Sequence, residues 1–299
     1  MIFVSELSVH IIKGVTAMKI NTENLFRDAE YKNDEILPYS EAISIISGND
    51  TLYGYVLVPG GNYKESRPCV IMFHGFPGYT NNNDIEQALR RCGCFVVHVN
   101  HRGAWGSGGN YTFSGLTEDA HAIIDWSVRD ETVKKYNIDT ENIFLIGHSM
   151  GGMTVINTLR HDNRVKAAAA VTPYDLAYGF KNGEEELKEL IRTEGACLKY
   201  ESNEAIFENA KRNYEELSLE NAYEDVKNKN LLLIGAEYDT IAPIEKMIRP
   251  LWNRLEKSGG NGKREFVLFR TDHTLCSMRV ELTEKLAEWI RDLIEGVKK

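Results

Sequence analysis

The sequence predicts an α/β protein in which helices flank a mostly parallel central sheet and a helical cap is inserted between two strands. From residue 69 onward, short apolar runs rich in Val, Ile and Leu alternate with stretches of helical periodicity, which is typical of parallel sheets buried on both faces. The alternation stops over residues 173–230 and then resumes. Because that interruption is too long for a plain loop and contains helical stretches, it predicts an inserted cap.

The expected elements follow from local composition and periodicity. Residues 42–47 and 51–58, joined by Gly48-Asn49-Asp50, predict a β-hairpin. Further strands are expected at 69–73, 94–99, 143–146, 165–171, 231–234 and 265–269, and helices at 83–92, 116–129, 153–160, 184–199, 203–217, 244–257 and over the stretch that carries Leu282, Leu286, Trp289, Ile290 and Leu293. The chain then divides into an N-terminal extension (1–39), an α/β core (40–172 and 231–299) and a helical cap (173–230).

The composition describes an ordinary globular domain, with 42% hydrophobic and 26% charged residues. A net charge of −9 without a basic tract argues against nucleic acid as a partner, and no apolar run is long enough to span a membrane. Five cysteines at irregular spacings predict free thiols in a reducing, cytoplasmic compartment. Cys92 and Cys94 lack a His/Cys pair at zinc spacing, so no metal is expected. The oligomeric state stays open, as does the origin of residues 1–17, which either precede a start at Met18 or pack on the body.

The most informative stretch is residues 143–152, in which four apolar residues precede Gly-His-Ser-Met-Gly-Gly. It predicts a buried strand, a sharp turn that exposes the hydroxyl of Ser149, and a helix. Gly147 and Gly151 flank the serine because side chains there would clash as strand and helix approach. The unpaired N–H groups at the start of the helix would favour an oxyanion beside the hydroxyl. Ser149 is therefore the candidate nucleophile.

A serine nucleophile needs a base, which is usually a histidine. Of the eight histidines, His273 follows the last predicted strand, at the sheet edge where the carboxyl ends of the strands gather. We therefore expect His273 to be the base. His148 lies inside the turn and is too close in sequence to Ser149 to swing back onto it, and His98 lies along a buried strand.

A carboxylate should hold the imidazole in the required tautomer. Asp239 follows the strand at 231–234 and lies at the same sheet edge as His273. Glu237 and Asp272 are rivals, but Glu237 is nearer its strand, and Asp272 is adjacent to the histidine, where the needed geometry is rare. Asp239 is therefore the expected acid, which gives the chain order serine, acid, histidine.

Two backbone N–H groups should bind the oxyanion. The turn after the strand at 69–73 supplies Gly75, which lets the backbone bend, and Phe76, whose N–H can point at the oxyanion. Pro77 has no N–H and cannot serve. The N–H of Met150, directly after the nucleophile, is the second expected donor.

Residues 100–109 are rich in glycine but lack the Gly-Lys-Ser/Thr ending of a phosphate-binding loop. A structural role is expected, with Arg102 bonding backbone carbonyls beneath the pocket. Trp105 either lines the pocket or covers core. With Tyr79 and Tyr174, it forms the expected set of substrate-contacting residues.

Together these residues resemble the α/β-hydrolase superfamily over about residues 40–299. The matching motifs are His74-Gly75-Phe76, Arg102-Gly103-x-x-Gly106-x-Gly108, Gly147-His148-Ser149-Met150-Gly151-Gly152, Asp239 with Pro243, and Asp272-His273. The Arg102 stretch and the late Asp-His pair are similar to prolyl-oligopeptidase-like and dienelactone-hydrolase-like members, and the serine turn to bacterial carboxylesterases and feruloyl esterases. Two departures are the lack of a β-propeller ahead of the domain and a serine where dienelactone hydrolases use cysteine.

The resemblance implies a serine hydrolase that works through an acyl-enzyme without metal or cofactor. The leading hypothesis is hydrolysis of small or medium acyl or aryl carboxylic esters, with a small-molecule ester as the partner. A small peptidase or amidase, and a catalytically silent binding protein of the same fold, are the alternatives.

Overall fold

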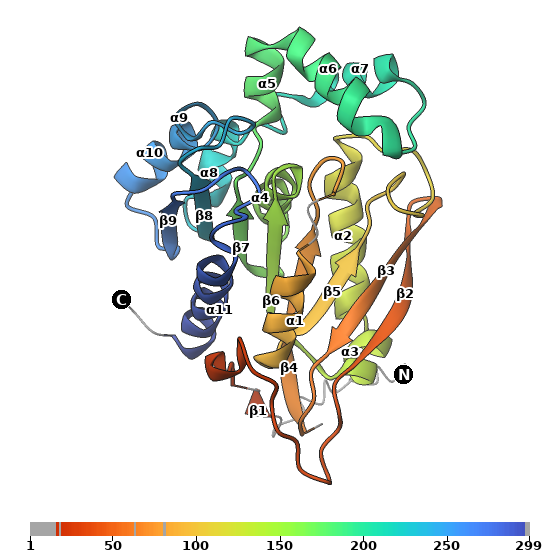
Figure 1. Ribbon diagram of the computed structural model, residues 1–299, viewed down its shortest axis with the longest axis vertical. Helices are drawn as coiled ribbons and strands as arrows, with labels where there is room; N and C mark the ends of the chain where they lie inside the picture. The colour runs from red at the N-terminus through yellow and green to blue at the C-terminus, as the bar shows by residue number, and fades with distance from the viewer. Residues whose placement is uncertain (1–15, 18, 63, 80–81, 297–299) are drawn as a thin grey trace, which may run out of the picture.

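The computed structural model describes residues 16–17, 19–62, 64–79 and 82–296, which form a nine-stranded sheet with helices on both faces (Figure 1). The strands are β1 (Thr16–Ala17), β2 (Tyr39–Ser47), β3 (Asp50–Val58), β4 (Glu65–Phe73), β5 (Phe95–Val99), β6 (Ile138–His148), β7 (Val165–Val171), β8 (Asn230–Ala236) and β9 (Arg264–Phe269). The predicted fold class, a mostly parallel α/β sheet, is confirmed.

The strand order is β2-β3-β5-β4-β6-β7-β8-β9, and β1 pairs separately with β4. The hairpin strands β2 and β3 are antiparallel to each other, and β3 is antiparallel to β5. All the other pairs, from β5 across to β9, are parallel. One edge of the sheet therefore carries the carboxyl ends of β4, β6, β7, β8 and β9. The sequence predicted that the candidate residues follow strands that end at such an edge.

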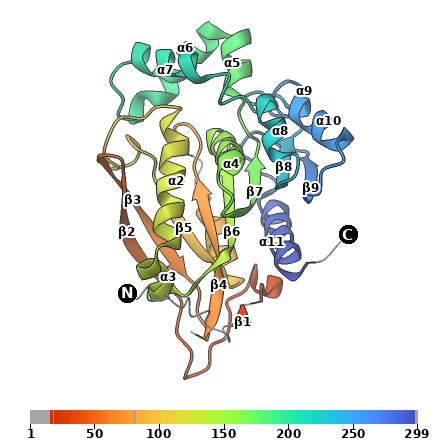
Figure 2. The ribbon, with the colours of Figure 1, turned by 180° about the vertical axis from the view of Figure 1, so that it is seen from behind.

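Two helical layers bury the sheet. One face carries α1 (Asn83–Arg91) and α11 (Arg279–Glu295), and the other carries α2 (Gly115–Val128), α3 (Asp130–Tyr136), α4 (Met150–His161), α8 (Tyr223–Val226) and α10 (Arg249–Lys257) (Figures 1 and 2). Each face has its own apolar cluster. Ile20 and Leu25, which flank the 3-10 helix Thr22–Asn24, pack into the cluster under α1 and α11. Whether residues 1–17 precede the start or pack on the body stays open, because, of these residues, only Thr16 and Ala17 are described.

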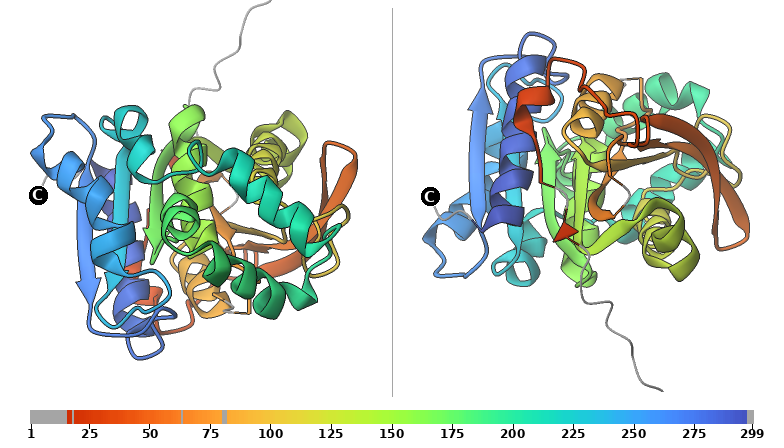
Figure 3. Two further views of the ribbon diagram at one scale, coloured as in Figure 1. Left: turned by 90° about the horizontal axis from the view of Figure 1, so that it is seen from above. Right: turned by 90° about the horizontal axis from the view of Figure 1, so that it is seen from below.

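Three helices cross above the carboxyl ends of the strands: α5 (Leu176–Asn182), α6 (Glu184–Glu194) and α7 (Asn203–Asn213) (Figure 3). They dock on the loop before α2, where Lys199 bonds through its carbonyl to the N–H of Tyr111 (2.8 Å) and through its N–H to the carbonyl of Gly103 (2.7 Å). Phe180 packs on Phe207 and Tyr214 within this layer, with ring centroids 5.6 and 4.7 Å apart. Farther along, α8 lies beside α4 and α10 rather than over the strand ends.

The structure departs from the expected elements at particular residues. The single helix predicted over 244–257 is wrong, because α9 (Ile244–Met247) and α10 are separated at Ile248. Pro250 causes the break, since it has no N–H to donate to the carbonyl of Lys246. The short helices α3 and α5 were not expected, and β6 begins five residues before the predicted strand at 143.

Candidate active site

Ser149 lies in the turn between β6 and α4 with a backbone that L residues rarely adopt, φ 57° and ψ −117°. Such a conformation costs about 1–3 kcal/mol and persists only where the surroundings impose it. Here three hydrogen bonds impose it. The Ser149 N–H donates to the carbonyl of Val171 (2.9 Å), and the Ser149 carbonyl accepts from Met153 (3.1 Å) and Tyr174 (3.1 Å). The serine is thus fixed at the sharp strand-to-helix turn that the sequence predicted.

Two glycines make the turn sterically possible. A Cβ on Gly147 would lie 2.0 Å from the carbonyl oxygen of Gly151, and a Cβ on Gly151 would lie 2.3 Å from the carbonyl oxygen of Phe73. Both neighbours are backbone atoms that no side-chain rotation can move away. The strand and the helix therefore approach each other only because both positions are glycine.

His273 and Asp239 are brought together by the structure. The Nδ1–H of His273 donates to Oδ2 of Asp239 at 2.7 Å, and both side chains are buried. The other carboxylate oxygen, Oδ1, accepts from the N–H groups of Ile241 (2.9 Å) and Ala242 (2.7 Å). These bonds fix the carboxylate and assign the proton of the neutral imidazole to Nδ1, which leaves Nε2 as an acceptor.

Glu237 and Asp272, the alternatives to Asp239 as partner of His273, bond to other residues. Glu237 pairs with Arg270 at the surface (3.0 Å). Asp272 accepts from the N–H of Cys276 (3.0 Å) and the hydroxyl of Thr274 (3.0 Å), inside its own loop. Of the three acidic candidates, Asp239 alone has a carboxylate hydrogen-bonded to His273 within the described part of the chain.

The loop after β4 lies against Ser149. A Cβ on Gly75 would lie 3.0 Å from Cβ of Ser149, which is tighter than an ordinary contact, so glycine eases this approach. Neither the N–H of Phe76 nor that of Met150 donates to another of the described residues. The Phe76 ring packs on Tyr111 and Phe113, with centroids 5.5 and 5.8 Å apart, and this contact anchors the loop.

The three predicted substrate-contacting residues lie in different surroundings. Trp105 and Tyr79 are 45% and 61% exposed and meet edge to face, with centroids 5.7 Å apart. The indole N–H of Trp105 donates to the carbonyl of Pro77 (3.0 Å), so the tryptophan supports the Phe76 loop. Tyr174 is buried in the core, and burial raises the pKa of its phenol to about 12. Its backbone N–H bonds to Ser149, and its role toward a substrate stays a prediction.

The expectation that Arg102 bonds backbone carbonyls is wrong. Its guanidinium donates to the carboxylate of Asp119 (2.9 Å) and the hydroxyl of Ser47 (3.1 Å), and it pairs with Glu118 at the surface (3.0 Å). Asp119 is buried in α2 and also accepts from the backbone N–H of Arg102 (2.8 Å). A buried carboxylate needs charged and hydrogen-bonded partners more than carbonyls do, and this explains the difference.

Sequence reasoning missed the part played by His148. The Nε2–H of His148 donates to the backbone carbonyl of His273 (2.9 Å), and the two rings lie 4.9 Å apart. The hydroxyl of Thr172 donates to the same carbonyl (3.0 Å). Burial lowers the pKa of His148 to about 4, and the neighbouring His273 adds to the effect, so the ring is neutral at pH 7. No sequence signal reveals a contact between positions so far apart.

The structure holds no sign of a metal centre in its described part: no group of three or more His, Cys, Asp or Glu side chains there is arranged to hold an ion. The five cysteines are free, as predicted, and three of them are buried. Within the described residues, no helix is both long and apolar enough to cross a bilayer.

The strand order, with one antiparallel hairpin at the edge of a parallel sheet and a serine turn after a central strand, is that of the α/β hydrolases, and the protein has the α/β-hydrolase fold. Residues 68–195 match the family model for that fold. A solved 2,6-dihydroxy-pseudo-oxynicotine hydrolase is similar over 87% of this chain and 70% of its own, with 16% identity and a TM-score of 0.66.

Two esterases of known structure are also similar. The Pyrococcus furiosus esterase Pf2001 covers 93% of this chain and 97% of its own, with 19% identity and a TM-score of 0.62. Est1E from Butyrivibrio proteoclasticus, solved with ferulic acid bound, covers 85% of this chain and 99% of its own, with 17% identity and a TM-score of 0.64. At such identities the likeness establishes the fold.

A curated Escherichia coli protein, an uncharacterized 31.7 kDa protein from the traX-finO intergenic region, is 32% identical over 114 residues. The match covers 36% of this chain and 37% of that protein, so it spans little more than a third of either.

Proposed function

We propose that the protein is a serine hydrolase that cleaves carboxylic esters, with Ser149 as nucleophile, His273 as base and Asp239 as acid. The observation that carries the proposal is the 2.7 Å hydrogen bond between Nδ1 of His273 and Asp239, made beside a serine held in a strained turn. The carbonyl of His273 is bonded to His148 and Thr172. His148 directly precedes Ser149 in the chain, and Thr172 directly follows Val171, whose carbonyl bonds to Ser149.

In the proposed reaction, Oγ of Ser149 attacks the ester carbonyl carbon as its proton passes to Nε2 of His273. The tetrahedral intermediate collapses when the C–O bond to the alcohol breaks and His273 returns the proton to the leaving oxygen. A water then attacks the acyl-enzyme, again giving its proton to His273. The acid is released as the Ser149 Oγ–acyl bond breaks and the proton returns to Oγ.

Asp239 stabilises the imidazolium that forms in each half-reaction and does not itself take up the proton. Its two bonds from Ile241 and Ala242 hold the carboxylate in its orientation toward His273. The N–H groups of Phe76 and Met150 are the proposed oxyanion donors, and a donor of this kind typically lowers the barrier by about 3 kcal/mol.

Esters are favoured as substrates because two of the similar structures are esterases. A Pyrococcus horikoshii acylaminoacyl peptidase is similar as well, with 16% identity and a TM-score of 0.64 over 88% of this chain and 43% of its own, so an amide substrate is the second candidate. We retain the cytoplasm as the proposed location because all five cysteines are free thiols.

A substrate panel tests the proposal. Wild-type protein and the variants Ser149→Ala, His273→Gln and Asp239→Asn are assayed on nitrophenyl esters of increasing acyl length and on aminoacyl-aminocoumarins. The proposal expects faster cleavage of esters and a loss of about 10³-fold or more in kcat/KM for Ser149→Ala. Faster amide cleavage would favour a peptidase, and activities unchanged by Ser149→Ala would support a binding protein.

A further inference from the structure

The imidazole of His74, the first residue after β4, bonds to the peptide group that carries one of the proposed oxyanion donors. Its Nδ1 lies 2.8 Å from the carbonyl oxygen of Gly75. A carbonyl oxygen can only accept, so Nδ1 carries a proton and donates it. The same peptide group carries the N–H of Phe76, and the C=O and N–H of a trans peptide point in opposite directions. The bond therefore directs the Phe76 N–H away from the His74 ring.

The other ring nitrogen of His74 fixes its protonation state. Nε2 accepts from the backbone N–H of His101 at 3.3 Å. An N–H group can only donate, so this nitrogen carries no proton. Two backbone groups of unambiguous role thus define the neutral Nδ1–H tautomer. Burial lowers the pKa of His74 to about 3, and the neighbouring His101 acts in the same direction, so the ring keeps this form at neutral pH.

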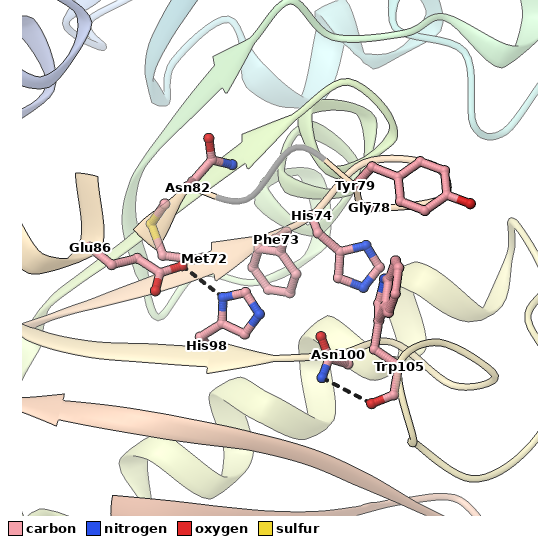
Figure 4. Close-up of a pocket in the computed structure, with 10 residues that line it drawn as sticks. All are labelled: Met72, Phe73, His74, Gly78, Tyr79, Asn82, Glu86, His98, Asn100 and Trp105. Atoms are coloured by element: carbon pink, nitrogen blue, oxygen red, sulfur yellow. Dashed lines mark hydrogen bonds and ion pairs between the residues drawn. The ribbon is translucent and has the colours of Figure 1, made fainter. Parts of the chain in front are cut away.

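The loop after β4 turns closely around this ring. His74 is buried, and in the pocket that Figure 4 shows, its ring lies beside Gly78 and Trp105. A Cβ on Gly78 would lie 2.6 Å from Nδ1 of His74, and the φ of Gly78 is +98°. A glycine at this position lets the chain close around the imidazole. The imidazole is thus enclosed by the loop to which it bonds.

We propose that His74 is a positioning residue for ester hydrolysis: by holding the Gly75 carbonyl, it aims the N–H of Phe76 at the oxyanion. The inference rests on the proposed function. The N–H of Phe76 donates to no other of the described residues, which leaves it available to the substrate. A Cβ on Gly75 would lie 3.0 Å from Cβ of Ser149, so the held peptide lies beside the proposed nucleophile. A donor that is oriented before the reaction needs no rearrangement when the oxyanion forms.

A role confined to stabilising the loop predicts a different outcome. The loop has another tether, because the indole N–H of Trp105 donates to the carbonyl of Pro77 (3.0 Å). That bond holds the peptide after Pro77, whereas the bond from His74 holds the peptide that carries the proposed donor. If His74 only stabilised the loop, its loss would lower the stability of the protein without changing how the enzyme distinguishes an oxygen anion from a sulfur anion.

The test compares a nitrophenyl ester with its thiono analogue, in which sulfur replaces the carbonyl oxygen. Sulfur is a weaker hydrogen-bond acceptor, so the thiono ester gains less from an aligned N–H donor. Wild-type protein should cleave the oxygen ester faster, and the ratio of the two kcat/KM values reports the alignment of the donors. Asp239→Asn is the control, since it impairs the base and should slow both esters by the same factor.

Two variants of nearly the same shape isolate the donor. His74→Asn places an amide N–H near the position of Nδ1, and His74→Leu has the same branched side chain without a donor. The leucine variant should lower kcat/KM on the oxygen ester about 10- to 100-fold and the oxygen-to-sulfur ratio about tenfold, whereas the asparagine variant should keep both within about threefold of wild type. His74→Gln, which reaches the position of Nε2 instead and also leaves Gly75 without a donor, replaces the leucine variant if that variant fails to fold.

NMR of wild-type protein labelled with 15N in histidine gives a check that needs no substrate. The ring signals of His74, identified by their absence in His74→Asn, should show the neutral Nδ1–H tautomer. A charged ring, the Nε2–H tautomer, an unchanged ratio in the folded variants without a donor, or equal losses in the asparagine and leucine variants would overturn the inference alone. Wild-type protein that cleaves neither ester would overturn the proposed function, and this inference with it.

Discussion

The imidazole of His148 donates from Nε2 to the backbone carbonyl of His273, at 2.9 Å. This contact joins the residue before the proposed nucleophile to the proposed base. Thr172 donates to the same oxygen, so the His273 loop is held from two sides of the sheet edge. The distance between Ser149 and His273 therefore depends on residues that need not take part in proton transfer.

Removing this contact should slow catalysis through misplacement of the base. His148→Ala is expected to lower kcat on a nitrophenyl ester by about 10- to 100-fold with little change in KM. His148→Gln places an amide N–H where Nε2 stood and should recover most of the loss. Equal defects in Ala and Gln, or a change confined to KM, would contradict a positioning role.

Asp119 should matter for stability far more than its neighbour Glu118. Burial alone would raise the pKa of Asp119, but the His101 ring, 3.5 Å away, and the hydrogen bonds from Arg102 bring it down to about 2. Because the folded-state pKa lies below the unfolded value, this carboxylate stabilises the fold above about pH 4 and loses that effect as the pH falls toward 2.

At pH 7, Asp119→Ala leaves the partly buried Arg102 without its main partner and should lower the free energy of unfolding by about 3 kcal/mol. Glu118→Ala removes a carboxylate that pairs with the same arginine but is 67% exposed, so the loss should be below about 1 kcal/mol. Urea unfolding of both variants checks the prediction, and equal losses would refute it.

Asp175 should have the opposite pH dependence. Its side chain caps α5 by accepting from the N–H of Ala177 (2.9 Å). Burial nevertheless raises its pKa to about 6, and the charge of Glu220 acts in the same direction. The folded state then holds its proton more tightly than the unfolded state, so this group's contribution to stability falls as the pH rises from about 4 to 6.

Asp175→Asn keeps a good capping residue without a charge to bury. Relative to wild type, it should stabilise the protein by about 1–3 kcal/mol at pH 8 and have little effect at pH 4.5. Urea unfolding at the two pH values measures the difference. A variant that is destabilised equally at both would show that the carboxylate is well tolerated.

The tight approach of β4 to α4 predicts that Gly151→Ala disrupts the turn. The new Cβ would lie 2.3 Å from the carbonyl oxygen of Phe73, and the loss of stability should reach about 3 kcal/mol or more. Gly259→Ala is the matched control, since nothing lies within 4 Å of its Cβ, and its effect should stay within about 0.5 kcal/mol. Thermal unfolding compares them, and similar melting temperatures would be the contrary result.

Much of the fold was predictable because each central strand contains a short apolar run, as residues 167–171 of β7 do. The sequence predicted the ends and the existence of some helices wrongly. The seven residues of α3 are mostly polar and show little helical periodicity, and the break at Ile248 depends on how the fold accommodates Pro250. Both outcomes are set by local packing rather than by the hydrophobic pattern.

The candidate site was predictable to the extent that its residues follow strands whose ends converge. The Gly-x-Ser-x-Gly turn indicated Ser149, and the ends of the predicted strands together with the chain order indicated Asp239 and His273. The partner of Arg102 and the role of His148 depend on contacts between distant segments, such as β6 with the loop after β9. Patterns of residue types along the chain do not predict which side chains come into contact in the folded protein.

The acyl-enzyme at Ser149 is the central claim, and rapid-mixing kinetics with nitrophenyl acetate test it most directly. The account predicts a burst of nitrophenol equal to the enzyme concentration, and an acetyl group found by mass spectrometry on the peptide that contains Ser149. The burst and the label should both vanish in Ser149→Ala. Steady turnover without an acetylated Ser149 under quenched conditions, or a burst that survives Ser149→Ala, would contradict it.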